Sequence, residues 1–167
     1  MNKIKVSDIW QILETVCDPE VPVLTVIDLG IVRDVKIIEF SAKPPLGGLG
    51  VEVVITPTYT GCPAMDMIAM NIRLALLEHG YLNIKITTVL SPAWTTDWMS
   101  DEGKRKLAVY GIAPPKGNAG EIAKDGIECP QCHSHNTKLL SEFGSTACKA
   151  LFQCGDCKEP FDYFKCH

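Results

Sequence analysis

The chain has 167 residues, and 20 acidic residues against 16 basic ones give it a net charge of −4. Its composition, 46% hydrophobic and 22% charged, supplies material for a packed core and argues against disorder. No apolar run approaches the roughly 18 residues of a membrane span, the first residues lack the features of a secretory signal, and no basic run suits nucleic acid. We therefore expect a globular cytoplasmic protein with no membrane or nucleic-acid partner.

Periodicity predicts the elements of the first part in chain order. A helix begins at Ser7, its expected N-cap, and ends at the turn around Pro19, because proline disfavours helix before it. Residues 31–56 are rich in β-branched residues and predict an antiparallel hairpin, with an exposed tip at 41–50. A helix then begins at Pro63, which suits the first helical position, and ends near His79.

A strand over 81–90 and a second long helix over 95–111 complete the predicted first domain. Helix, two strands, helix, strand and helix predict an α+β fold, a small sheet with helices packed on one face. We assign residues 1–111 to this domain and the Pro- and Gly-rich residues 112–126 to a linker. Residues 127–167 are too few to bury a stable core unaided, so we expect a metal to stabilise them or docking onto the first domain to do so.

Eight cysteines in a reducing compartment favour metal ligation or thiol chemistry over a disulfide framework. Four of them form two CxxC turns that are 21 residues apart, Cys129 with Cys132 and Cys154 with Cys157. Two such turns supply the tetrahedral sulfur shell that zinc prefers, and the segments 136–144 and 146–154 can pair as strands of a β-rich zinc ribbon. Iron in the same shell, or four unligated thiols, are the alternatives. A closed four-cysteine site leaves no open position for catalysis, so we expect the zinc to be structural.

Other residues of the C-terminal part have two interpretations each. Cys148 and Cys166 lie outside the two turns, and His133, His135 and His167 are close enough in sequence to substitute as ligands. Because four cysteines suffice, we favour spare-thiol or packing roles over ligation. The aromatic residues form either a surface that docks a protein or the core of the ribbon: Phe152, Phe161, Tyr163 and Phe164.

Cys62 directly precedes Pro63 and so lies at or beside the N-cap of the predicted helix, where unpaired N–H groups favour a thiolate. Such a cysteine is either reactive or metal-binding, or it packs as a small apolar residue. Asp18, Glu20 and Asp28 occupy turns that can approach Cys62, and turn chemistry is the alternative, which we favour for Asp28.

Cys17 and the two tryptophans of the segment 90–100 are candidates for packing. We expect Cys17 to pack at the end of the first helix. Trp94 and Trp98 either belong to a partner groove or fill the core, and we favour the core.

The segments DPEVPVLTVIDLGIVRDV (18–35) and TPTYTGCPAM (56–65) resemble the SufT-like family of domain of unknown function fifty-nine. That family is associated with iron–sulfur cluster assembly, and the cysteine that matches Cys62 is its signature functional residue. With LSPAWTTDWMS (90–100) and the cysteine-rich C-terminal part, almost the whole chain resembles the PaaD (PaaJ) family of bacterial phenylacetate catabolism.

The resemblance implies a role in the system of phenylacetyl-CoA epoxidase, a di-iron oxygenase served by an iron–sulfur reductase. We expect a non-enzymatic factor that matures or inserts an iron–sulfur or iron centre, with Cys62 holding it transiently, Asp18 and Glu20 as accessory residues and the reductase as the main partner. A structural or regulatory subunit of the epoxidase is the alternative, and a thiol enzyme is a distant one. The apolar surface of helix 63–79 also suggests a homodimer.

Overall fold

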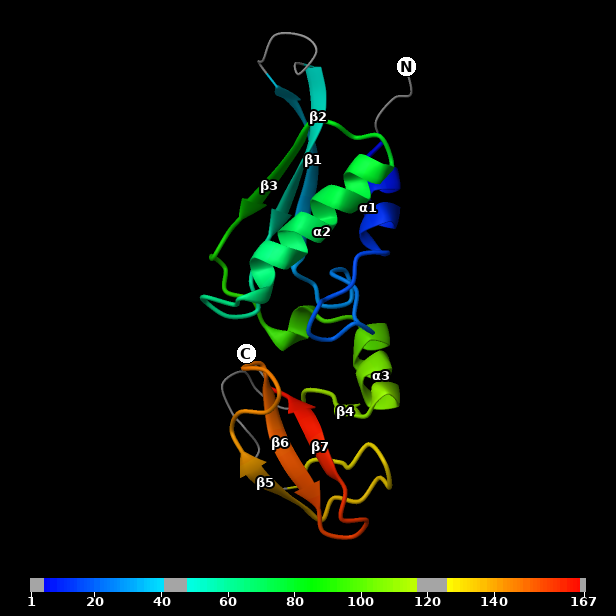
Figure 1. The fold of residues 1–167 in the computed structure, drawn as a ribbon, viewed down its shortest axis with the longest axis vertical. Coiled ribbons are helices and arrows are strands. Elements are labelled where there is room, and N and C mark those ends of the chain that lie inside the picture. The colour runs from blue at the N-terminus through cyan, green and yellow to red at the C-terminus, as the bar shows by residue number, and fades with distance from the viewer. Residues whose placement is uncertain (1–4, 41–47, 117–125, 166–167) are drawn as a thin grey trace. The chain divides into compact units, whose positions relative to one another are not determined.

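The computed structural model describes residues 5–40, 48–116 and 126–165 and divides into two compact units, Met1–Trp94 and Thr95–His167 (Figure 1). The predicted boundary lay instead at residue 111, because the long third helix was assigned to the first domain. Across the described ranges, no helix has the length and apolar character needed to cross a membrane.

The sheet of the first unit has three strands in the order β1-β2-β3. Strands β1 (Val32–Phe40) and β2 (Gly48–Ile55) form the predicted antiparallel hairpin, and β3 (Ile84–Thr88) pairs with β2 in parallel. Of the predicted tip, residues 41–47 lie outside the described residues, and residues 48–50 belong to β2.

The two faces of this sheet differ in polarity, as alternation along a strand requires. On one face Val51, Val53 and Ile55 are fully buried. On the other, the Glu52 carboxylate lies 2.8 Å from the Lys85 ammonium and accepts a 2.6 Å hydrogen bond from Thr87. Both contacts lower the pKa of Glu52, and Lys85 contributes more than Thr87. The polar face is therefore the solvent face.

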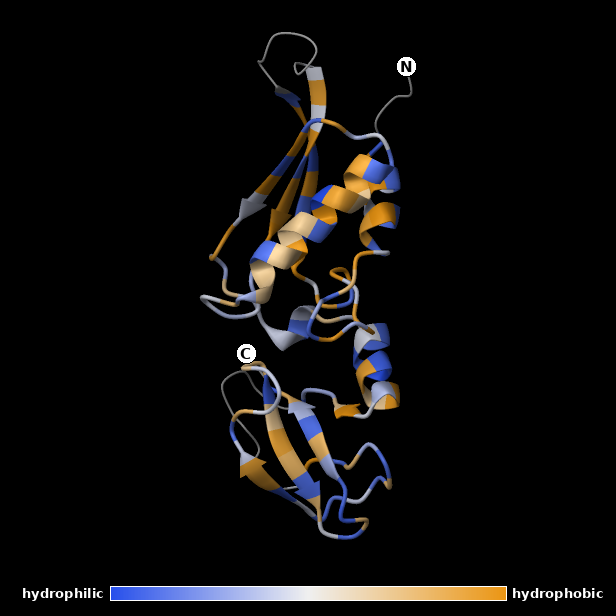
Figure 2. Ribbon diagram, in the orientation of Figure 1, coloured by the Kyte–Doolittle hydropathy of each residue, from blue (hydrophilic) through white to orange (hydrophobic). Residues whose placement is uncertain are grey.

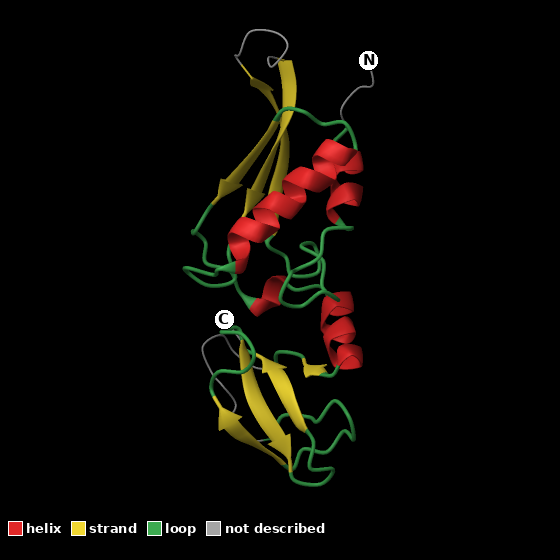
Figure 3. Ribbon diagram, in the orientation of Figure 1, coloured by secondary structure: helices red, strands yellow, loops and turns green. Residues whose placement is uncertain are grey.

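Helices α1 (Val6–Leu13) and α2 (Ala64–Glu78) pack side by side over the apolar face (Figure 3). Helix α2 begins one residue later than predicted, because Pro63 is its N-cap. The expected Ser7 cap of α1 is wrong, because the helix already begins at Val6 and the Ser7 hydroxyl donates to Asp8. Both helices bury one row of side chains, comprising Ile9, Ile12 and Leu13 of α1 and Ala64, Ile68, Ile72 and Leu76 of α2.

Trp94 is the last residue of the first unit. Its side chain is 4% exposed, and its indole N–H donates a 2.8 Å hydrogen bond to the carbonyl of Leu29. This bond ties the segment after β3 to the Asp28-Leu29-Gly30 turn that precedes β1. The expectation that Trp94 fills the core is confirmed, whereas Trp98 is only half-buried, in the second unit.

The predicted helix over 95–111 is two elements in the structure. A short 3-10 helix, η1 (Thr96–Trp98), is followed by α3 (Asp101–Tyr110), and Met99 between them is extended. The interruption arises at Ser100, whose hydroxyl accepts a 2.8 Å hydrogen bond from the N–H of Gly103 and caps α3. Helix α3 also belongs to the second unit.

The second unit contains a four-stranded sheet in the order β4-β7-β6-β5. The predicted pairing of 136–144 with 146–154 is confirmed by the antiparallel strands β5 (Thr137–Ser141) and β6 (Lys149–Cys154). Two strands were not predicted, β7 (Pro160–Phe164) and β4 (Ile112–Ala113). Because β4 pairs with β7, the first residues of the predicted linker 112–126 belong to this sheet. Residues 117–125 lie outside the described residues.

The buried row of α2 leads to a stability prediction. Ile72→Ala removes a side chain with no exposed surface, so we expect the first unit to lose about 2–5 kcal/mol of unfolding free energy. Leu82→Ala, at a position 77% exposed, is the control and should lose less than about 0.5 kcal/mol. Urea unfolding of the purified chain measures both, and equal losses would contradict the packing described.

Candidate metal centre

The structure brings the four predicted cysteines together. The sulfur atoms of Cys129, Cys132, Cys154 and Cys157 all lie within 4.8 Å of one another. The Cys129 and Cys157 sulfurs are 3.7 Å apart, and those of Cys132 and Cys154 are 3.5 Å apart. A zinc tetrahedron with bonds of about 2.3 Å has sulfur–sulfur edges of roughly 3.8 Å, so the cluster fits the ion. Over the described ranges, it is the one group of three or more metal-binding side chains.

Both CxxC turns end in the same unusual backbone conformation. The residue after the second cysteine has a positive φ in each turn, +61° at His133 and +68° at Lys158. Non-glycine residues seldom adopt this left-handed conformation, which marks a strongly constrained backbone. In the first turn the N–H of His133 donates to the carbonyl of Cys129 at 2.9 Å. The matching turns place two pairs of sulfurs around one centre.

The surroundings of the cluster shift the pKa values of three of its thiols. Hydrogen bonds from the N–H groups of Cys157 and Asp156 lower the pKa of Cys154 to about 6, despite its desolvation. At Cys157 the N–H of Glu159 lowers the pKa, but desolvation and the three neighbouring thiols outweigh it and raise the pKa to about 12. The pKa of Cys132 is also raised, since desolvation and Cys154 outweigh the Ser134 backbone. A divalent cation would bind all four sulfurs as thiolates.

A hydrogen-bond network that the sequence analysis missed joins the two turns. The Asp156 carboxylate accepts a 2.5 Å hydrogen bond from the Ser134 hydroxyl and a 2.7 Å bond from the Asn136 amide. Both bonds lower the pKa of Asp156, and the bond from Ser134 contributes more than that from Asn136. The Gly155 N–H also donates to the Asn136 carbonyl at 2.6 Å. The one sequence signal was an acidic residue inside the second CxxC turn.

The four aromatic residues for which a docking surface was the alternative form the core of this unit, so that interpretation of them is wrong. Phe152 stacks on Phe161 and meets Tyr163 edge to face. These three side chains are at most 4% exposed, and Phe164 is 2% exposed. The same apolar cluster includes Cys129 and Cys154, which are fully buried. The metal site is therefore continuous with the core.

The histidines lie outside the sulfur cluster. The ring Nδ1 of His133 lies 3.0 Å from the Glu128 carboxylate, and that of His135 lies 3.0 Å from the carbonyl of Gly126. Cys148 is also separate; it is buried, with its sulfur 3.0 Å from the Thr146 hydroxyl, as a packing role predicts. Cys166 and His167 lie outside the described residues.

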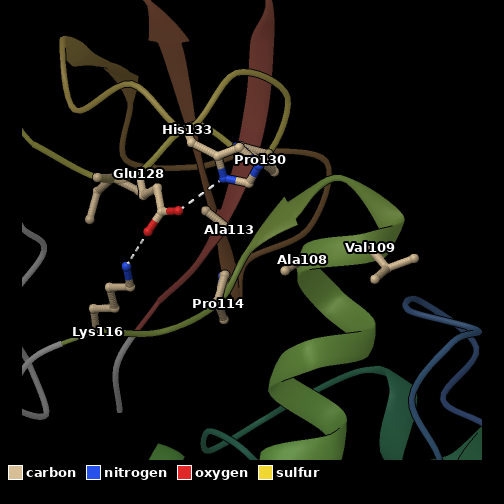
Figure 4. A pocket seen from close by; sticks show the side chains of 9 residues that line it. Ala108, Val109, Ala113, Pro114, Lys116, Glu128, Pro130 and His133 are labelled. Atoms are coloured by element: carbon tan, nitrogen blue, oxygen red, sulfur yellow. Dashed lines mark hydrogen bonds and ion pairs between the residues drawn. The ribbon is translucent and has the colours of Figure 1, made fainter.

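A cavity of about 390 Å³ lies beside the first CxxC turn (Figure 4). Its wall is mostly apolar and includes Val109, Pro114 and Pro130. On its charged side the Glu128 carboxylate contacts both Lys116 and His133, an arrangement here called the bridge. Lys116 donates to Glu128 at 2.7 Å. Lys116 first, and then His133, lower the pKa of Glu128 to about 2. The bridge joins the segment after β4 to the metal-binding turn.

Cys62 lies in the first unit, immediately before Pro63, the N-cap of α2. Its N–H donates to the Tyr59 carbonyl at 3.2 Å, which closes a tight turn. Gly61 occupies the third position of this turn with φ +81°, a conformation that favours glycine. The half-buried Cys62 belongs to no cluster of three or more metal-binding side chains within the described ranges. The predicted place beside the N-cap is confirmed, whereas its reactivity stays a prediction.

The acidic residues near the N-terminus have structural contacts. Asp18 accepts hydrogen bonds of 2.8 and 2.7 Å from the N–H groups of Glu20 and Val21. Asp28 accepts bonds from the N–H and hydroxyl of Thr25, as its favoured turn role predicts. An accessory role of Asp18 and Glu20 stays a prediction. Cys17, which we expected to be packed, is exposed because α1 already ends at Leu13.

Comparisons with known proteins match two separate parts of the chain to two different families. A family model described as an iron–sulfur cluster assembly protein matches residues 7–80, and a model described as the PaaD zinc beta ribbon domain matches residues 113–165. A protein of Escherichia coli (strain K12), named as one of the subunits of "Putative 1,2-phenylacetyl-CoA epoxidase", is 45% identical, over 97% of this chain and 93% of the relative.

Further relatives resemble part of the chain. A Porphyromonas gingivalis protein named "Fe-S protein maturation auxiliary factor" is 36% identical over 60% of this chain and 89% of its own length. A solved domain of unknown function fifty-nine from Bacillus anthracis is similar with a TM-score of 0.51 and 26% identity, over 62% of this chain and 91% of its own. A conserved hypothetical protein from Thermotoga maritima gives a TM-score of 0.50 and 29% identity, over 64% and 97%.

Zinc content tests the metal site. Cys129→Ser removes one of the four sulfurs, so we expect the purified protein to lose its zinc and the second unit to lose its fold. Cys148→Ser changes a buried cysteine outside the cluster and should keep one zinc per chain. Elemental analysis counts the metal; iron in its place, or equal zinc in both variants, would contradict the assignment.

The network between the turns gives a second test. A Cβ added at Gly155 would lie 2.7–2.8 Å from side-chain atoms of Asn136, so Gly155→Ala forces Asn136 away from Asp156. We expect zinc affinity to fall by about tenfold, the lower end of what lost outer-shell contacts cause. Asn136→Ala should give a similar loss, and competition with a chelator measures both. Unchanged zinc affinity in the two variants would show that the network does not support the site.

Proposed function

This chain belongs to the PaaD family, and from that premise we propose that it is a non-enzymatic factor that matures or inserts an iron–sulfur or iron centre in a phenylacetyl-CoA epoxidase system. The name of the Escherichia coli relative supports the system, and the match of residues 7–80 to an iron–sulfur assembly family supports the kind of chemistry.

The position of Cys62 carries this proposal. The zinc site uses four sulfurs and leaves no open coordination position, so a transient cargo needs a thiol elsewhere. Cys62 is a half-buried cysteine at the start of α2, inside the segment that matches the assembly family. A thiolate is a soft ligand that suits iron and iron–sulfur fragments. We propose that Cys62 holds the cargo, with Asp18 and Glu20 as accessory residues.

The second unit has a different role in this proposal. Zinc holds the ribbon together, and the ribbon contacts the recipient, for which we propose the iron–sulfur reductase of the epoxidase system. Since the side chains of Phe152, Phe161, Tyr163 and Phe164 are buried, they do not supply this contact. The cavity beside the first CxxC turn offers a concave apolar wall with the Lys116–Glu128–His133 bridge on one side (Figure 4).

A stoichiometric subunit of the epoxidase is the second candidate. The observation in its favour is the name of the Escherichia coli relative, which calls that protein a subunit. In this case Cys62 only packs, and the chain stays bound to the oxygenase in a constant ratio. The maturation factor instead acts on its recipient and leaves it.

The test is the iron and labile sulfide content of the reductase, isolated from cells that express the wild-type chain, Cys62→Ser, Cys17→Ser or no chain. Cys17 is the matched control because it is an exposed cysteine of the same unit. We expect Cys62→Ser and the deletion to give reductase with little cluster, and Cys17→Ser to behave as wild type. Unchanged iron and sulfide in all strains would reject maturation of this recipient and favour the stoichiometric role.

A further inference from the structure

Helix α2 is apolar on two opposite sides. Its inner residues, Ala64, Ile68, Ile72 and Leu76, are at most 6% exposed. Four others are 54%, 52%, 49% and 39% exposed and are here called the outer seam: Met67, Met70, Leu74 and Leu77. At 3.6 residues per turn, the outer seam faces away from the buried row. Figure 2 accordingly shows orange and tan segments along α2, broken by a few blue ones.

An uncovered apolar row of this kind is unusual. A helix that is apolar all round is normally covered on all sides, whereas a surface helix has a polar outer face. Scattered exposed apolar residues need no explanation, but a continuous row marks an interaction surface. The outer seam extends over roughly 15 Å of helix, at ~1.5 Å per residue, without a charged member.

The spacing of the outer seam defines what fits it. Successive members are three, four and three residues apart, which is the a and d pattern of a coiled coil. Such a seam packs against a helix with the same spacing. Of the helices in the described ranges, α2 is the one that exposes this pattern; α1 exposes Val6, and α3 exposes the neighbours Val109 and Tyr110. A second copy of this chain therefore supplies a matching helix.

The charges beside the outer seam favour a parallel pair. Arg73 takes the g position and Glu78 the e position of the next heptad, and these positions face each other across a parallel pair. Each Arg73 would then meet Glu78 of the other copy, twice per dimer. Arg73 uses one nitrogen to bind the Ile84 carbonyl at 3.0 Å, and Glu78 forms no ion pair with another described residue. An antiparallel pair with the same seam residues matched would instead bring the two Arg73 side chains together.

We infer that two copies of this chain form a homodimer through the outer seams of α2, packed in parallel. Both α2 helices then begin at the same end, so the two Cys62 residues lie on the same side of the dimer. Four half-exposed side chains are a small contact compared with the ~800 Å² per partner of a standard interface, so the dimer is weak and depends on concentration. This inference goes beyond the proposed maturation role and is tested separately from it.

Sedimentation velocity over a range of protein concentrations tests the contact. We expect the zinc-loaded wild-type chain to pass from monomer to dimer as the concentration rises. Leu74→Glu places an unpaired carboxylate in the seam and should weaken the dimer by more than ~100-fold. Leu82→Glu, at an exposed position outside α2, is the control and should dimerise as wild type does. Circular dichroism and zinc content verify that each variant is folded.

Charge reversal tests the orientation. Arg73→Glu and Glu78→Arg should each weaken the dimer by about threefold or more, and the double variant should restore it. A wild-type chain that stays monomeric at all concentrations overturns the proposal and assigns the outer seam to a different protein. Dimerisation of Leu74→Glu equal to that of wild type also overturns it. Failure of the double variant to restore dimerisation overturns the parallel arrangement.

Discussion

Four cysteine sulfurs, held within 4.8 Å of one another, are the contact on which the second unit depends. Cys129 and Cys154 belong to the same buried cluster as Phe152 and Tyr163, so the metal site and the core of the ribbon are one structure. Contacts within the cluster shift the pKa values of two of its thiols in opposite directions, to about 6 at Cys154 and about 12 at Cys157. Zinc binds all four sulfurs as thiolates, and these four bonds offset the small size of the core.

The first unit depends on the packing of apolar side chains. A three-stranded sheet packs one apolar face under α1 and α2 and leaves a polar face to solvent, so packing of side chains is enough to hold it. Its one notable thiol, Cys62, is placed by a tight turn with Gly61 at positive φ and stays half-buried. In the second unit four cysteines converge on one site, while Cys62 of the first unit belongs to no such cluster among the described residues. That contrast supports a structural metal in one unit and a transient cargo in the other.

The sequence was most informative where chemistry is local. The two CxxC turns, the β1–β2 hairpin and the start of α2 at Pro63 depend on neighbouring residues, and the structure contains all of them. Contacts between distant residues were missed. Examples are the pairing of β4 with β7 and the bond from Trp94 to Leu29. The break before α3 was overlooked because Ser100 is a weak sign of a cap until its hydroxyl is seen to accept from Gly103.

We propose that Cys62 carries iron while the four ribbon cysteines hold zinc. Anaerobic incubation of the purified chain with ferrous iron and sulfide, followed by metal analysis and native mass spectrometry, tests it directly. We expect the wild-type chain to bind iron or an iron–sulfur fragment and to keep its zinc, and Cys62→Ser to keep the zinc but bind no iron. Equal iron on both proteins, or iron that replaces the zinc in the ribbon, would contradict these metal assignments.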